Sequence, residues 1–164
     1  MMKTQITVQR FSVISSKPFG EVIKILETAV AHPDMGNLMN DITSARTYAD
    51  MERVIQTAAG VPGVMEFIRF NLGEIVRKER GDKAPRSLRF LIGNPLIIKQ
   101  MLEHVPDAGS YAPITVLVDE RPDGVHLSYD EMASFLGTYR SPEALKVARE
   151  LDTKIEAILI AAAA

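Results

Sequence analysis

The segment from Arg86 to Asp130 constrains the fold more than any other part of this 164-residue chain. Apolar and polar residues alternate over 86–92, which predicts a strand with one buried face. Gly93-Asn94-Pro95 then provides a turn, an N-cap and a proline in the first position of a helix. Residues 113–130 alternate again on both sides of Arg121-Pro122-Asp123-Gly124, a sequence typical of a tight turn. The segment therefore predicts a strand, a helix and a β-hairpin in that order.

Periodicity in the rest of the chain predicts two more strands and three amphipathic helices. The strands are expected at 5–15, with Phe11 and Ile14 among its apolar positions, and at 65–71. The helices are expected from a Ser15 or Ser16 cap to His32, from Thr43 or Ser44 to Ala59, and from a Ser141 cap along an apolar stripe to Leu159. Residues 34–40 include Gly36 and two asparagines and are expected to form a loop, and 73–80 one or two helical turns.

The predicted fold class is α+β. A long amphipathic helix has to bury its apolar stripe, and an antiparallel sheet with one wet face has one face left to cover. We therefore expect a two-layer sandwich in which helices cover one face of a mainly antiparallel sheet of about five strands. A chain of 164 residues with 46% hydrophobic content can bury one substantial core. We expect a single α+β domain over 1–164, with an inserted helical segment at about 34–63.

The composition excludes several chemistries. The chain has no cysteine, which rules out disulfides, thiolate nucleophiles, iron–sulfur clusters and cysteine-based zinc sites. The three histidines, His32, His104 and His126, show no metal-ligand spacing, so neither a metal nor another cofactor is expected. A formal net charge of −2 argues against nucleic acid, and no apolar run approaches the length of a bilayer span. We expect a cytoplasmic protein without nucleic-acid or membrane partners.

Several short motifs resemble one protein family. They are Leu91-Ile92-Gly93-Asn94-Pro95, Tyr111-Ala112-Pro113, Val116-Leu117-Val118, Pro122-Asp123-Gly124-Val125 and, near the start, Ser15-Ser16-Lys17-Pro18-Phe19. Together they are similar to the bacterial and archaeal family known as domain of unknown function 302. The resemblance implies a TATA-binding-protein-like α+β fold, with helices packed on a curved antiparallel sheet, and a homodimer. It implies no reaction. Many members of that family carry an Asp-His pair where this chain has Asn71-Leu72.

An anion site is predicted around the start of the central helix. Backbone N–H groups are unpaired at a helix start such as Asn94 and can bind an anion, although simple capping explains the same residues. Arg69 and Arg89 lie in the middle of predicted strands and would share one face of the sheet if those strands pair; solvated arginines are the ordinary alternative. Tyr111 and Ser110 stand just before the hairpin, and capping does not explain Ser110. The candidate ligand-binding residues are Arg89, Asn94, Tyr111, Arg69 and Ser110.

Three functional hypotheses remain open. The preferred one is a small homodimer that binds a small anionic molecule or a partner without catalysis, because no catalytic constellation can be assembled from the sequence. The second is a hydrolase- or isomerase-type enzyme that uses Ser110, His104 or His126 together with carboxylates. The third is a structural interaction module with no ligand. No catalytic residue is assigned.

Overall fold

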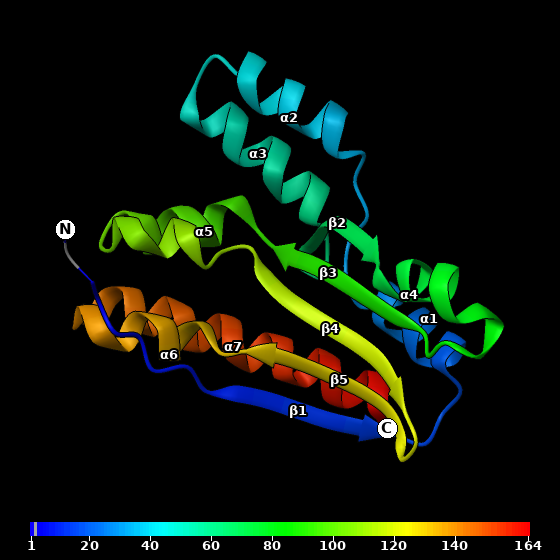
Figure 1. The fold of residues 1–164 in the computed structure, drawn as a ribbon. Coiled ribbons are helices and arrows are strands. Elements are labelled where there is room, and N and C mark those ends of the chain that lie inside the picture. Colours follow the sequence, from blue (N-terminus) through cyan, green and yellow to red (C-terminus); the bar gives the residue numbers. More distant parts are fainter. Residues whose placement is uncertain (2) are drawn as a thin grey trace.

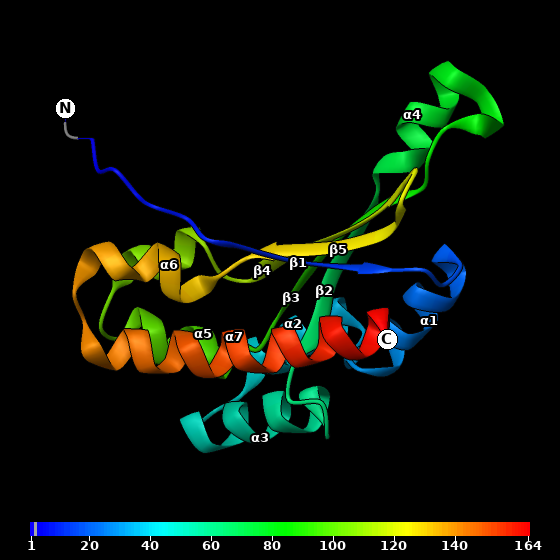
Figure 2. The same ribbon diagram turned by 90° about the horizontal axis from the view of Figure 1, so that it is seen from below.

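In the part of the chain that the structure describes, five antiparallel strands form one layer and helices form the other (Figures 1 and 2). The structure is a computed structural model that describes residue 1 and residues 3–164. The spatial order of the strands is β1-β5-β4-β3-β2. Their bounds are β1 Arg10–Ser15, β2 Met65–Asn71, β3 Ser87–Gly93, β4 Ile114–Arg121 and β5 Gly124–Asp130. The predicted fold class, an α+β two-layer sandwich, is confirmed.

The helices lie mainly on one side of the sheet. Figure 2 shows α7 running along this side with α1 and α5 next to it, whereas α4 projects from the opposite side. The pair α2 and α3 stands beyond β2, and the short α6 follows β5 (Figure 1). The bounds are α1 Phe19–Thr28, α2 Met35–Ser44, α3 Tyr48–Ala59, α4 Leu72–Arg80, α5 Pro95–Leu102, α6 Met132–Leu136 and α7 Pro142–Ala163. Among the described residues, no helix combines the length and apolar character that crossing a membrane requires.

Alternation along the strands gives the sheet a buried face and an uncovered face. Val116, Val118 and Leu127 are fully buried and share one core with Leu159 of α7. Successive side chains of a strand point to opposite sides, so the residues between them face away from the helices. We call this second surface the open face. It carries Arg10 and Ile14 of β1, Arg89 of β3, Thr115 and Leu117 of β4, and Ser128 of β5.

Residues 34–40 belong to α2 and its cap, so the loop predicted there is wrong. The Asp34 side chain accepts a hydrogen bond from the Asn37 N–H at 2.8 Å, which caps the helix. Leu38 is buried with Ile55 of α3 in a small cluster separate from the main core. This burial outweighs the low helix propensity of Gly36 and the neighbouring asparagines, because packing of an apolar face supplies most helical stability in proteins.

The N-terminal strand is shorter than predicted. Only residues 10–15 pair with β5, and residues 3–9 lie outside the sheet. Ile14 was expected among the apolar positions of the strand, yet it is 54% exposed, because it alternates onto the open face. Ser15 does not cap α1. Its hydroxyl donates to the carbonyl oxygen of Ala163 at 2.8 Å, which ties β1 to the end of α7.

Candidate functional site

The open face contains a pocket of about 420 Å³. It lies over the middle strands β3, β4 and β5 and extends to the segments just before β4 and just after β5. Three of the residues predicted from the sequence line it, namely Arg89, Ser110 and Tyr111. Further lining side chains, which the sequence did not single out, are Thr115, Leu117, Ser128 and Phe135.

Strand register places the polar residues of the pocket in two cross-strand rows. In the first row Arg89 pairs with Leu117, and Leu117 pairs with Ser128. In the next row Thr115 stands beside Asp130, because Val116 pairs with Tyr129. Rows two residues apart along a strand are separated by about 7 Å, so a long side chain of one row reaches the other. This geometry brings Nη2 of Arg89 to 3.4 Å from the Thr115 hydroxyl.

Arg89 carries the uncompensated charge of the pocket. Among the side chains that the structure describes, no carboxylate lies within ion-pair distance of its guanidinium, whereas Arg10, Arg69 and Arg121, also in strands, each contact one. Asp130, the acidic residue of the neighbouring row, already accepts from Arg10 at 2.7 and 2.9 Å. That hydrogen bonding raises the pKa of Arg10. Arg89 is therefore an exposed cation whose one hydrogen bond to a described residue is the long one to Thr115.

Ser128 is the second unusual member of the pocket. It is only 7% exposed, and its hydroxyl has no hydrogen-bond partner among the described residues. The other buried polar side chains all have one; they are Ser15, Asn94, His126 and Asp152. Among the described residues no fully buried side-chain oxygen or nitrogen lacks a partner, so the Ser128 hydroxyl opens onto the pocket and is available to whatever occupies it. The sequence marks Ser128 only as a polar position between Leu127 and Tyr129, which does not reveal its burial.

Aromatic rings form the end of the pocket nearest α6. The rings of Tyr111 and Phe135 stack with their centroids 4.6 Å apart and their planes 12° from parallel. The hydroxyls of Tyr111 and Tyr139 are 2.8 Å apart. This hydrogen bond raises the pKa of Tyr139, so its hydroxyl stays protonated at neutral pH. The end of the pocket therefore offers apolar ring surface and no charge.

Arg69 lies on the helix side of the sheet, so the expectation that it shares a face with Arg89 is wrong. In the β2–β3 register Arg69 pairs with Phe90, and Phe70 pairs with Arg89. Consecutive residues of a strand point to opposite faces, which separates the two arginines. The guanidinium of Arg69 lies over the Phe90 ring, 4.6 Å from its centroid, on the buried side.

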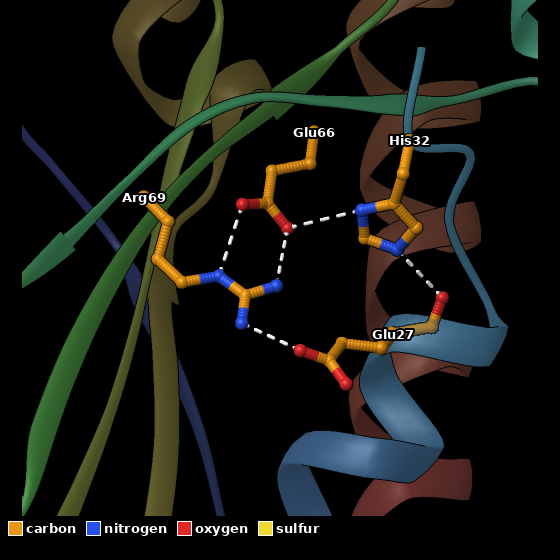
Figure 3. Close-up of polar contacts among 4 residues, drawn as sticks. All are labelled: Glu27, His32, Glu66 and Arg69. Atoms are coloured by element: carbon orange, nitrogen blue, oxygen red, sulfur yellow. Dashed lines mark hydrogen bonds and ion pairs between the residues drawn. The ribbon is translucent and has the colours of Figure 1, made fainter. Parts of the chain in front are cut away.

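An ion-pair network surrounds Arg69 (Figure 3). Its guanidinium donates to Glu66 at 3.0 and 2.7 Å and to Glu27 of α1 at 2.5 Å. Nδ1 of His32 lies 3.4 Å from the Glu66 carboxylate, and Nε2 lies 2.8 Å from the carbonyl oxygen of Glu27. The hydrogen bonds to Glu66 raise the pKa of Arg69 more than burial lowers it. Arg69 thus ties the edge strand β2 to α1.

Asn94 caps α5 and does not line the pocket. Its Oδ1 accepts from the Leu96 N–H at 2.8 Å, and its Nδ2 donates to the carbonyl oxygen of Gly63 at 2.9 Å. The side-chain amide therefore holds the start of α5 against the loop that follows α3. This arrangement favours simple capping over anion binding at Asn94.

Comparison with known proteins agrees with this fold. The model of the family described as "Domain of unknown function DUF302" matches residues 40–162, which is more than half of the chain. The chain belongs to the DUF302 family. The crystal structure of an uncharacterized conserved DUF302 protein from Bacillus stearothermophilus is similar, with a TM-score of 0.65 at 14% identity over 93% of this chain and 97% of that one. No curated protein matches the chain. The family resemblance inferred from the motifs is confirmed, and it assigns no activity.

A further pair of residues singled out by the family resemblance, Asn71 and Leu72, lies next to the pocket. Leu72 lines it, and Oδ1 of Asn71 accepts from the Glu74 N–H at 3.0 Å, which caps α4. The resemblance led us to expect an Asp-His pair at these positions in many members. This DUF302 chain has an apolar wall and a helix cap there instead.

The three histidines of this DUF302 protein lie apart from one another. Nε2 of His126 is 2.8 Å from Oδ1 of Asp123 at the hairpin turn, His32 belongs to the Arg69 network, and His104 is exposed. No hydrogen bond between described residues joins a histidine to a hydroxyl. Within residues 1 and 3–164, no three His, Asp or Glu side chains are grouped so as to hold a metal ion.

A buried carboxylate supports the pocket wall that Phe135 forms. Asp152 of α7 accepts hydrogen bonds from the N–H groups of Met132 and Ala133, each at 2.8 Å, at the start of α6. Burial raises the pKa of Asp152, although these two hydrogen bonds oppose the rise. Sequence reasoning missed this residue. Its signal is an acid that falls inside the apolar stripe of α7.

Proposed function

We propose that this DUF302 protein binds a small anionic molecule in the open-face pocket without catalysing a reaction on it. The observation that carries the proposal is Arg89, a cation that lines a pocket and has no carboxylate partner among the described side chains. An anion there would form charge-assisted hydrogen bonds, which are stronger than those between neutral groups. Ser110 and Tyr111 line the same pocket and remain part of the proposed site. Asn94 and Arg69 do not, because their donors already serve the fold.

An enzyme of hydrolase or isomerase type is less well supported. Such an enzyme needs a base within reach of a nucleophile or a substrate proton. The His126–Asp123 pair has a suitable geometry for a base and its orienting carboxylate, but it lies at the hairpin turn and does not line the pocket. Ser110 lines the pocket without a histidine partner among the described residues. Binding therefore accounts for more of the arrangement than catalysis does.

We propose further that the protein is a cytoplasmic homodimer. The resemblance to the family supports the dimer, and so do the apolar side chains of Ile68 and Phe70, which are 46% and 41% exposed on β2. Absence of cysteine is consistent with the cytoplasm. Light scattering of the purified protein tests the dimer, because one chain has a mass of 18.1 kDa. A mass of a single chain at micromolar concentration would contradict it.

A thermal-shift screen tests the ligand proposal. The full chain is melted with phosphate, sulfate, nucleotides and small carboxylates, each over a concentration series. A ligand at a hundred times its Kd adds about 2.7 kcal/mol to the free energy of unfolding. At this chain length such a gain raises Tm by roughly 5–11 °C. We expect at least one anion to give a saturating rise.

The Arg89→Ala variant decides whether the rise comes from this pocket. We expect Arg89→Ala to abolish the rise in Tm and Arg46→Ala to keep it. Arg46 is an exposed arginine between α2 and α3, so its substitution removes the same charge at a different place on the surface. If no anion shifts Tm, or if both variants respond as the wild type does, an anion pocket at Arg89 is refuted.

A further inference from the structure

The chemistry of the open-face pocket also points to the class of its ligand. Resting on the proposed function, we propose that the pocket takes a monocarboxylate with a flat apolar body and a neutral hydrogen-bonding group at its far end, the class represented by hydroxyaryl carboxylates. The carboxylate binds Arg89, the body lies over Leu117, and the neutral polar group meets Ser128. Charge, wall chemistry and the spacing of the two polar residues each support this assignment.

The charge of the pocket suits a single negative charge. Arg89 is the lining cation without a carboxylate partner among the described residues, because Asp130 already holds Arg10 at 2.7 and 2.9 Å. The Arg10–Asp130 pair adds no net charge. A ligand with two or three negative charges would bring its further charges near Asp130 with no cation to balance them, and like charges at short range are destabilising. A monoanion is therefore preferred over a di- or triphosphate.

The walls suit a flat apolar body. Tyr111 and Phe135 present stacked rings at one end, and Leu72 and Leu117 add aliphatic surface. The hydroxyl of Tyr111 is engaged with that of Tyr139, so the ring offers mainly apolar surface to the pocket. Ligand sites are typically lined by such apolar groups, with a small number of polar groups that fix orientation. Inorganic anions would leave this surface unused.

Ser128 provides the second polar contact. The residue is only 7% exposed, its hydroxyl opens onto the pocket and has no hydrogen-bond partner among the described residues, and it lies in the same cross-strand row as Arg89. Leu117 separates the two in that row, so their Cα atoms are two strand spacings apart, about 10 Å. A ligand with its carboxylate at Arg89 and a ring over Leu117 places a polar group on the opposite ring position near Ser128. That group has to be neutral, because no second lining cation is free to balance a charge there.

Calorimetric titration of the full chain tests the class with three matched probes: 4-hydroxybenzoate, benzoate and 4-hydroxybenzamide. We expect 4-hydroxybenzoate to bind most tightly. Loss of the ring hydroxyl in benzoate is expected to weaken binding by about 2–10-fold, the size of one neutral hydrogen bond. Loss of the charge in 4-hydroxybenzamide is expected to weaken it by about 10–100-fold, the size of a charge-assisted contact.

Two serine variants locate the hydroxyl contact. Ser128→Ala is expected to remove the preference for 4-hydroxybenzoate over benzoate while leaving benzoate affinity unchanged. Ser12→Ala is the control, because Ser12 pairs with Ser128 across β1 and β5 but does not line the pocket. Melting of Ser128→Ala should be unchanged within about 1 °C, because the hydroxyl makes no hydrogen bond within the described part of the chain. A fold that needs this hydroxyl would instead melt lower.

The outcomes separate this inference from the proposed function. If phosphate or a nucleotide binds in an Arg89-dependent way and none of the aryl carboxylates does, the pocket is an anion site and the ligand class is wrong. If the aryl carboxylates bind but Ser128→Ala keeps their full preference, the assigned orientation is wrong. If no tested anion binds in an Arg89-dependent way, both the proposed function and this inference are refuted.

Discussion

Replacement of Asp152 tests how the wall of the pocket is held. The Asp152 carboxylate accepts from two consecutive backbone N–H groups, those of Met132 and Ala133, and these begin α6. α6 in turn carries Phe135, whose ring stacks on Tyr111. In Asp152→Ala both N–H groups lose their acceptor inside the protein. Removal of one partner leaves the full desolvation cost on the other, which is why such deletions are expensive.

The structure sets the size of the expected loss. A hydrogen bond to a charged group contributes about 1.5–3 kcal/mol, and loss of an aspartate cap costs about 0.5–2 kcal/mol. Part of this is offset by repulsion between carboxylates, because the pKa of Glu131 is raised by burial and, to a smaller extent, by the charges of Asp152 and Glu156. We expect a net loss of about 2–3 kcal/mol, which lowers Tm by roughly 4–12 °C at this chain length. Asp152→Asn keeps one acceptor oxygen and should lose about 1 kcal/mol.

The pH dependence gives an independent check of the same carboxylate. Because burial raises the pKa of Asp152, the folded state binds this proton more tightly than the unfolded chain does. The stability of the wild type should therefore gain as pH falls through the folded pKa, with the full gain present below the unfolded value of about 3.9. Carboxylates whose pKa is lowered in the folded state, such as Glu120, have the opposite effect: their contribution to stability is lost as pH falls through the lowered folded pKa. The measured quantity is the difference in Tm between wild type and Asp152→Asn over a pH series that runs from neutral toward the unfolded pKa of about 3.9.

Thermal melting followed by near-ultraviolet circular dichroism reports both stability and the Tyr111 environment. We expect the advantage of the wild type over Asp152→Asn to grow as pH falls from neutral through the folded pKa of Asp152. Lys146→Ala on the exposed side of α7 serves as a control that should melt within about 1 °C of the wild type. A melting point of Asp152→Ala equal to that of the control would refute the argument that this carboxylate holds α6.

Further predictions concern the turn, the helices and the second arginine. Gly124→Ala should lower the free energy of unfolding by about 2–3 kcal/mol, because φ is +141° and a Cβ would lie 2.6 Å from the Ser15 carbonyl oxygen. Gly20→Ala, which meets nothing within 4 Å on α1, should raise it by about 0.5–1 kcal/mol. Arg69→Ala should cost about 1–3 kcal/mol in denaturant melts and leave anion binding unchanged. Loss of anion binding in Arg69→Ala would contradict its placement on the helix side.

The sequence predicted those helices and strands whose apolar periodicity and capping or turn residues match the face that is buried in the structure. The hairpin at 113–130 alternates and has a turn sequence at its centre, and β4 and β5 pair there in an uninterrupted register. Asn94 and Ser141 cap their helices as expected. α2 and the short α6 could not be predicted in this way. α2 is stabilised by the packing of Leu38 against Ile55, and α6 is supported by Asp152 of α7. Both helices therefore depend on tertiary contacts, which local sequence propensity does not report.

The candidate site was partly predictable for a related reason. Arg89 stood out because a cation interrupts an apolar strand, and the same signal picked Arg69. The sequence pattern cannot tell which of these two cations has an acidic partner. Glu27 lies 42 positions away from Arg69. Glu66, three residues before Arg69, would point to the opposite face of a regular strand but for the register shift between Glu66 and Ile68. Ser128 could not be identified at all, because a serine in an alternating strand looks like an ordinary solvent-facing position. Its burial belongs to the pocket that it lines together with Tyr111 and Phe135, which are not its neighbours in the sequence.

Stability and binding draw on different polar groups in this protein. Arg69 and Asp152 use their polar atoms within the fold, so their substitution is expected to cost stability first. Arg89 has only a long contact to Thr115, and Ser128 has no partner among the described residues, so the fold gains little from either. Arg89 is exposed and the Ser128 hydroxyl opens onto the pocket, so both groups stay available to a ligand. A ligand that supplies both an anion and a hydrogen-bonding partner would use these two groups together, and neither contact would compete with an interaction that holds the fold.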